Sequence, residues 1–177
     1  GALQPSTQTL AGETIWHPDP KVQQICRTMH ETLVRKGWYD PLWSSALLVR
    51  YLPDETPGTI IRGYKLITIT TSDKTLETWL AHCWVDVGGV EIDIGGDDAV
   101  GRPAGGSIQS RLTTDRTAVE PLIRSTSPIQ MQVAATFADR VDRYNEDPNS
   151  YYHQMNERYP RLAIRQLCRA LARIKNA

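Results

Sequence analysis

The sequence predicts an α+β domain with a small antiparallel sheet flanked by helices, and three observations support this fold class. Helical patterns open the chain, alternating β-rich segments fill its middle, and helical patterns return in the last third. A run of strands between runs of helices is typical of α+β proteins. The length of 177 residues suits one domain.

The first residues differ from the rest of the chain. Residues 1–18 contain Pro, Thr, Gly and Ser with little periodicity, which predicts an extended N-terminal arm held in place by Ile15 and Trp16. Residues 19–177 are then expected to form a single α+β domain whose last third is helical.

Two helices are expected next. An apolar stripe over residues 20–36 predicts the first, which Gly37 ends. Residues 40–52 predict the second, because Asp40 is a good N-cap residue and Pro41 suits the first helical position. A turn-rich loop over 53–58 follows.

The middle of the chain predicts strands. Residues 59–71 read as one long strand, and residues 79–94 as a hairpin that turns at Gly88-Gly89. In the register of a two-residue turn, His82 and Asp93 share one face of the hairpin and lie one diagonal step apart. A carboxylate beside an imidazole either orients a general base or forms a structural bridge between strands.

The hairpin carries a family resemblance. Its pattern His-x-Trp-Val-acid-Val-x-Gly-x-x-Ile-Asp, from His82 to Asp93, resembles the His and Asp strands of transglutaminase-like proteins in the papain-like cysteine hydrolase superfamily. The resemblance covers residues 38–95 and implies a papain-like fold, with His82 as general base and Asp93 as its orienting acid. Trp43 and Trp84 are expected beside the substrate groove.

The chain departs from this family at the nucleophile. The family places a cysteine at the start of the helix before the apolar strand, and here that helix start has Ser44 and Ser45 but no cysteine. Three interpretations stay open. The chain is a catalytically silent relative, it uses Ser44 or Ser45 as nucleophile, or one of these serines is an engineered replacement of cysteine. Ordinary first-turn polarity also explains both serines.

The three cysteines do not supply the nucleophile. Cys26 and Cys168 fall on apolar helical stripes, and Cys83 alternates away from His82. The odd number and the spacing argue against a disulfide framework and a structural zinc site. We expect buried thiols in a reducing, cytoplasmic setting, with no metal and no cofactor.

Composition narrows the partners. With 20 basic and 20 acidic side chains, the net charge is zero, so nucleic acid is an unlikely partner. No apolar run reaches membrane-spanning length, so no membrane association is expected. A protein or peptide partner is the class that we expect, and oligomer formation stays possible.

Two features follow the hairpin. Residues 95–110 are rich in glycine and predict a loop that serves either as a lid or as a plain surface loop. Helices are expected from Ser127-Pro128 to about Tyr144, from Asp147-Pro148 through Met155, and from Pro160 onward. The last helix carries arginines at four-residue spacing, which form either a solvated face or a site for phosphate or RNA: Arg161, Arg165, Arg169 and Arg173.

The sequence therefore favours a papain-like or transglutaminase-like domain that lacks the usual cysteine and serves as a non-catalytic interaction or assembly module. The alternative is an acyl hydrolase or transferase that uses His82 and Asp93 with a nucleophile at Ser44 or Ser45. A weaker alternative is phosphate or RNA binding through the four arginines of the last helix.

Overall fold

A computed structural model describes residues 9–10, 13–94, 100–103 and 111–177. Their elements follow the order β1 (Thr9–Leu10), β2 (Glu13–Thr14), α1 (Pro20–Lys36), α2 (Pro41–Tyr51), β3 (Gly58–Thr70), β4 (Thr75–Val87), β5 (Val90–Asp93), β6 (Val100–Pro103), β7 (Leu112–Thr113), α3 (Arg116–Thr126), α4 (Ile129–Glu146), α5 (Pro148–Arg158) and α6 (Arg161–Asn176). The expected α+β class with a small antiparallel sheet is confirmed.

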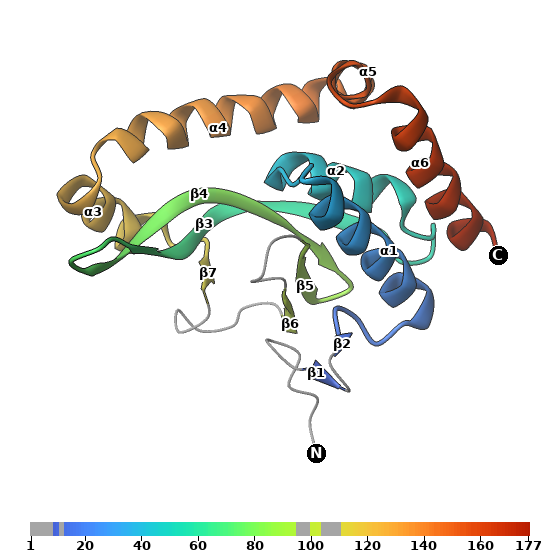
Figure 1. Ribbon diagram of the computed structural model, residues 1–177, viewed down its shortest axis with the longest axis horizontal. Helices are drawn as coiled ribbons and strands as arrows, with labels where there is room; N and C mark the ends of the chain where they lie inside the picture. The colour runs from blue at the N-terminus through green and yellow to red at the C-terminus, as the bar shows by residue number, and fades with distance from the viewer. Residues whose placement is uncertain (1–8, 11–12, 95–99, 104–110) are drawn as a thin grey trace.

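Within the described residues, the main sheet has five strands in the order β6-β5-β4-β3-β7, and each neighbouring pair is antiparallel. Its centre is the long β3–β4 hairpin, in which Gly58 pairs with Val87 and Thr70 with Thr75. The sheet is curved, and the helices lie along one side of it (Figure 1).

The helix boundaries follow local capping. The Asp19 side chain accepts hydrogen bonds from the N–H groups of Lys21 and Val22 at the start of α1, and Gly37 ends that helix with φ of 67°. The Asp40 side chain accepts from the N–H groups of Leu42 and Trp43 at the start of α2. Both expected helices are therefore present, close to the boundaries that the sequence predicts.

Successive side chains of the β4–β5 hairpin point alternately to the two faces of the sheet. Val85, Val87 and Ile92 are buried against α1, α2 and α6 in the largest apolar cluster. Cys83 packs in a second cluster with Leu42, Ala46 and α4, and Trp79 packs in a third against α3. The face that bears these side chains is the helix-covered face of the sheet. His82, Trp84, Glu91 and Asp93 alternate with them and point to the opposite face.

Two expectations for the elements need correction. β4 begins at Thr75 rather than at residue 79, because its first residues continue the pairing with β3. Residues 100–103 form strand β6 on the edge of β5, so 95–110 is not one uninterrupted loop. The expected lid over its other residues lies outside the described part. Strand β7 and helix α3 were not predicted, and Pro121 inside α3 hides its helical pattern.

The described part of the expected N-terminal arm includes two short strands. Thr9–Leu10 and Glu13–Thr14 pair as a short antiparallel ribbon. Trp16 is buried in the main cluster as expected, and the His17 imidazole donates a hydrogen bond from Nε2 to the carbonyl of Val87 at 3.1 Å. None of the described helices is long and apolar enough to cross a membrane.

Candidate functional site

His82 and Asp93 form a buried pair on the face of the sheet that points away from the helices. His82 Nε2 lies 3.0 Å from Asp93 Oδ1, and the two residues are 4% and 2% exposed. The Gly88-Gly89 turn sets the register, since both glycines have positive φ and Val87 pairs with Val90. The predicted hydrogen-bonding geometry of this pair is therefore confirmed.

A third residue, Lys65, completes the group. Lys65 Nζ lies 3.3 Å from Asp93 Oδ2, so the carboxylate uses one oxygen for each partner. Lys65 comes from β3, two residues after Gly63, which pairs directly with His82. We call Lys65, His82 and Asp93 the sheet cluster. Sequence reasoning missed Lys65, although its place on the same alternating face as Gly63 is visible in the strand pattern.

The electrostatics of the sheet cluster favour an ionised Asp93. Burial acts to raise the pKa of this carboxyl group, but the charges and hydrogen bonds of His82 and Lys65 outweigh burial. Its pKa therefore lies below the ordinary value of an aspartic acid. A buried carboxylate that pairs with a lysine and an imidazole has the composition of a structural cluster.

Trp84 packs close to the sheet cluster. Its ring stacks beside His82, with centroids 6.2 Å apart, and its Nε1 donates a hydrogen bond to the carboxylate of Glu91. A side chain at position 63 would collide with the Trp84 ring and the carbonyl of Thr113, so only glycine fits there. Trp84 is 1% exposed and therefore does not form the wall of an open groove.

The two serines lie on the other side of the sheet. Ser45 Oγ accepts a hydrogen bond from Cys83 Sγ at 3.6 Å, and Cys83 points to the helix-covered face. Ser44 Oγ donates to the carbonyl of Asp40 at 3.0 Å, within its own helix turn. Because the sheet separates these hydroxyls from His82, the structure does not bring either serine to the imidazole. The alternative interpretation, in which a serine at the start of α2 acts with His82 and Asp93, needs a contact that is not present in this geometry.

An ion pair and a helix cap fix the start of α2. Asp40 pairs with Arg140 of α4 at 3.1 Å while its carboxylate caps the helix. Cys83 lies nearby, and burial raises the pKa of its thiol to about 12. A thiol that stays protonated at neutral pH is a poor nucleophile, so Cys83 is a core residue.

The remaining thiols match the expectation of core positions. Cys26 is fully buried in α1, where burial raises its pKa, and Cys168 is partly buried on α6. All three are free. Among the described residues, no group of three His, Cys, Asp or Glu side chains is suited to hold a metal ion.

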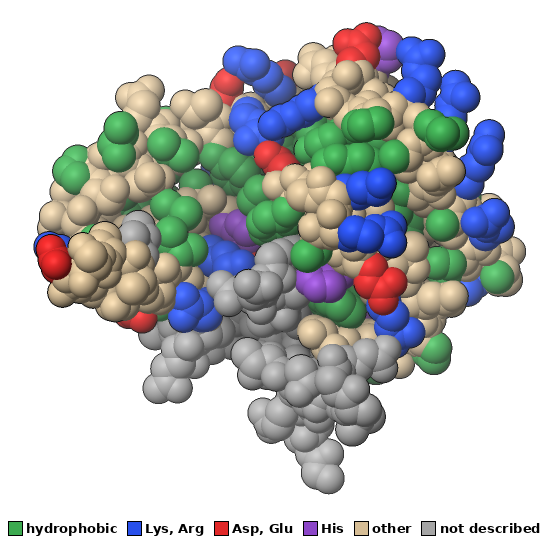
Figure 2. All heavy atoms as spheres, viewed as in Figure 1, with side chains coloured by type: hydrophobic (Ala, Val, Ile, Leu, Met, Phe, Trp, Pro, Cys, Tyr) green, Lys and Arg blue, Asp and Glu red, His purple; other side chains and the backbone are tan. Residues whose placement is uncertain are grey.

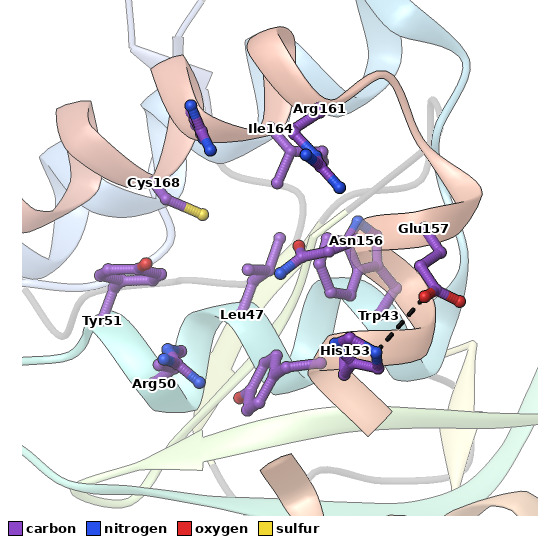
Figure 3. A pocket seen from close by; sticks show the side chains of 12 residues that line it. Trp43, Leu47, Arg50, Tyr51, His153, Asn156, Glu157, Arg161, Ile164 and Cys168 are labelled. Atoms are coloured by element: carbon purple, nitrogen blue, oxygen red, sulfur yellow. Dashed lines mark ion pairs between the residues drawn. The ribbon is translucent and has the colours of Figure 1, made fainter. Parts of the chain in front are cut away.

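Trp43 and Trp84 do not share a groove, contrary to the sequence prediction. Trp43 packs on the helix side, where its ring stacks on Tyr159 with centroids 5.7 Å apart. Trp43 instead lines a pocket between α2, α5 and α6 (Figure 3). This pocket, which we call the interhelical pocket, is the second candidate site of the molecule.

The arginines of α6 divide between two environments. Ile164, Leu167 and Leu171 bury the apolar face of this helix, as the sequence predicts, and all four arginines are exposed. Arg161 and Arg165 line the interhelical pocket, whereas Arg169 and Arg173 lie farther along the helix. Lys and Arg side chains gather over α6 on the right of the molecule (Figure 2).

The chain was compared with protein families, curated proteins and solved structures. No family model, no curated protein and no solved structure matches the chain.

Proposed function

We propose that this chain is a non-catalytic interaction module related to papain-like or transglutaminase-like proteins. In it, the pair of His82 and Asp93 has a structural role. One observation carries the proposal. The sheet cluster lies on the face of the sheet that points away from α2, while the helix-start serines lie on the helix-covered face. A general base performs acyl transfer only with a nucleophile within its reach, and neither Ser44 nor Ser45 meets this condition.

Charge supports the structural role of the sheet cluster. Lys65 is 9% exposed and shares the carboxylate of Asp93 with His82. A nearby anion stabilises a buried cation, and Asp93 is such an anion for Lys65. Through its contacts with Lys65 and His82, Asp93 also joins strands β3, β4 and β5. In a hydrolase the imidazole has to stay accessible to substrate, whereas His82 is 4% exposed.

A test of this proposal places a thiol where the family has its nucleophile. Ser44→Cys and Ser45→Cys, each in a Cys168→Ser background, are treated with iodoacetamide at neutral pH. We expect labelling no faster than that of a free thiol and no effect of adding His82→Ala, because the imidazole does not reach either position. Fast labelling that depends on His82 contradicts the proposal.

A protein is the partner class that we propose. The apolar stripe of α4 is buried at Phe137, Val141 and Tyr144, but it continues into solvent at Ile129 and Val133, which are 71% and 47% exposed. Hydrophobic side chains gather over the beginning of this helix (Figure 2). Large apolar side chains that leave the core in this way are typical of surfaces that a protein covers.

The simplest protein partner is a second copy of this chain. Sedimentation velocity at rising concentration should show self-association that Ile129→Glu weakens, since the new charge would have to be desolvated at the contact. Gln130→Glu, which adds a charge at the neighbouring position of the same helix, is the matched control. A chain that stays monomeric at every concentration excludes the second copy.

A further inference from the structure

We propose that the interhelical pocket binds a small organic phosphate. The pocket has a volume of about 380 Å³ and lies between α2, α5 and α6. This volume falls in the lower part of the range of small-molecule sites, roughly 300–1,000 Å³. The pocket lies on the opposite side of the sheet from the sheet cluster. Phosphate binding there does not depend on whether His82 is catalytic.

Positive charge converges on this pocket from two helices. Arg50 of α2 and Arg161 and Arg165 of α6 line it, and all three are exposed. Figure 3 shows these two helices on either side of the hollow. Guanidinium groups donate paired hydrogen bonds that match the oxygens of a phosphate, which makes arginine the usual residue at such sites.

The acidic residue of the pocket already has a partner. Glu157 is the one carboxylate among the lining residues, and its Oε1 lies 3.3 Å from Nε2 of His153, one turn earlier on α5. Within the described residues, no ion pair joins a carboxylate to Arg50, Arg161 or Arg165. The lining therefore carries an excess of positive charge, although the chain as a whole is neutral.

The base of the pocket is apolar. Leu47, Ile164 and Trp43 line it, and Trp43 is 1% exposed. The apolar base favours an organic phosphate over the free ion.

Aromatic side chains give the pocket a fixed shape. The guanidinium of Arg50 lies 4.3 Å from the ring centre of Tyr152, which holds this cation in place through a cation–π contact. The Tyr152 hydroxyl donates to the carbonyl of Ala46 at 2.6 Å and so ties α5 to α2. A wall that is rigid before binding loses less conformational freedom when the ligand arrives.

The α6 helix offers a matched pair of variants for the test. Arg161→Gln/Arg165→Gln removes two charges from the pocket, and Arg169→Gln/Arg173→Gln removes two charges from the same helix outside it. Glutamine and arginine have similar helix propensities, so both variants should fold. Circular dichroism and thermal unfolding verify the fold before binding is measured.

The measurement is a ¹H–¹⁵N NMR titration at constant ionic strength with phenyl phosphate, inorganic phosphate and a single-stranded RNA oligonucleotide. We expect phenyl phosphate to bind saturably, with the largest shifts in α2, α5 and α6 and at the Trp43 indole N–H. The pocket variant should raise its Kd by about tenfold or more, and the control variant by less than about threefold. Inorganic phosphate should bind more weakly than phenyl phosphate.

Three results overturn the proposal. The first is the absence of saturable phenyl phosphate binding up to about 10 mM, a concentration that already corresponds to very weak affinity. The second is equal weakening by the two variants, which indicates a diffuse charge effect of α6. The third is RNA binding that is tighter than phenyl phosphate binding and equally sensitive to both variants, which assigns the row of arginines to nucleic acid.

Discussion

Replacing Asp93 by asparagine tests the sheet cluster most sharply. The substitution keeps the size of the side chain and removes the charge that faces Lys65 and His82 at 3.3 Å and 3.0 Å. It takes away the carboxylate that lies 3.3 Å from the Lys65 ammonium, whose side chain is 11% exposed. Removing one partner of a buried ion pair usually costs about 3–5 kcal/mol.

A variant that lacks both charges separates the interaction energy of Lys65 and Asp93 from the general destabilisation that any core substitution causes. Lys65→Met alone leaves the carboxylate of Asp93 with His82, and Lys65→Met/Asp93→Asn leaves neither charge. Because replacing a whole buried pair is often close to neutral, the double variant should be less destabilised than the sum of the two single variants. We expect a coupling free energy of about 1–3 kcal/mol, the range for residues in direct contact.

Urea unfolding at pH 7, followed by circular dichroism, gives the four free energies of this cycle. Asp93→Asn should lower the free energy of unfolding by about 3–5 kcal/mol, which lowers the melting temperature by roughly 6–20 °C in a domain of this size. A loss below about 1 kcal/mol, or a double variant whose loss equals the sum of the single losses, refutes a structural ion cluster.

Three further predictions follow from the same structure. The Asp93 pKa is below its ordinary value in the folded chain, so its contribution to stability is present above about pH 4 and disappears as the pH falls toward the folded pKa. Urea unfolding between about pH 7 and pH 3 should show this loss in the wild type and a flatter profile in Asp93→Asn. Gly63→Ala should destabilise the chain by roughly 1–3 kcal/mol in urea, because the added carbon meets the Trp84 ring and the Thr113 carbonyl; wild-type stability would contradict this packing. Asp40→Ala should cost about 1–2 kcal/mol through the lost cap of α2, and Asp40→Asn, which keeps a capping oxygen, should cost less in the same assay.

Local chemistry made much of the fold predictable from the sequence. The caps Asp19 and Asp40 and the left-handed Gly37 set the limits of α1 and α2, and these signals depend on only a few neighbouring residues. The register of the β4–β5 hairpin was equally local, because the two glycines of the turn determine which residues pair. The prediction that His82 meets Asp93 depended on this register alone.

The register of the hairpin alone did not place the candidate site relative to the helices. The register shows that His82 and Cys83 point to opposite faces, but it does not name the face on which α2 packs. The signal was nevertheless present in the composition of the two faces. Val85, Val87 and Ile92 make one face apolar, so the helices cover that face. His82 belongs to the other face, away from the start of α2.

Contacts between distant segments were the least predictable. Lys65 reaches Asp93 through the pairing of β3 with β4, and the two residues are 28 positions apart in the chain. The interhelical pocket brings Trp43 of α2 beside Arg161 of α6. Neither neighbourhood follows from periodicity, since each depends on how complete elements pack against one another.

The most direct test of the central claim is a disulfide map of the two faces of β4. Ser45 Oγ contacts Cys83 Sγ at 3.6 Å, so a thiol introduced by Ser45→Cys lies within reach of Cys83. Mild oxidation of Ser45→Cys should therefore join position 45 to Cys83, as peptide mapping by mass spectrometry would show. In Ser45→Cys/Cys83→Ser/His82→Cys the second thiol lies across the sheet, and no bond between positions 45 and 82 should form. A bond between positions 45 and 82 would place the imidazole beside the helix start and contradict the account.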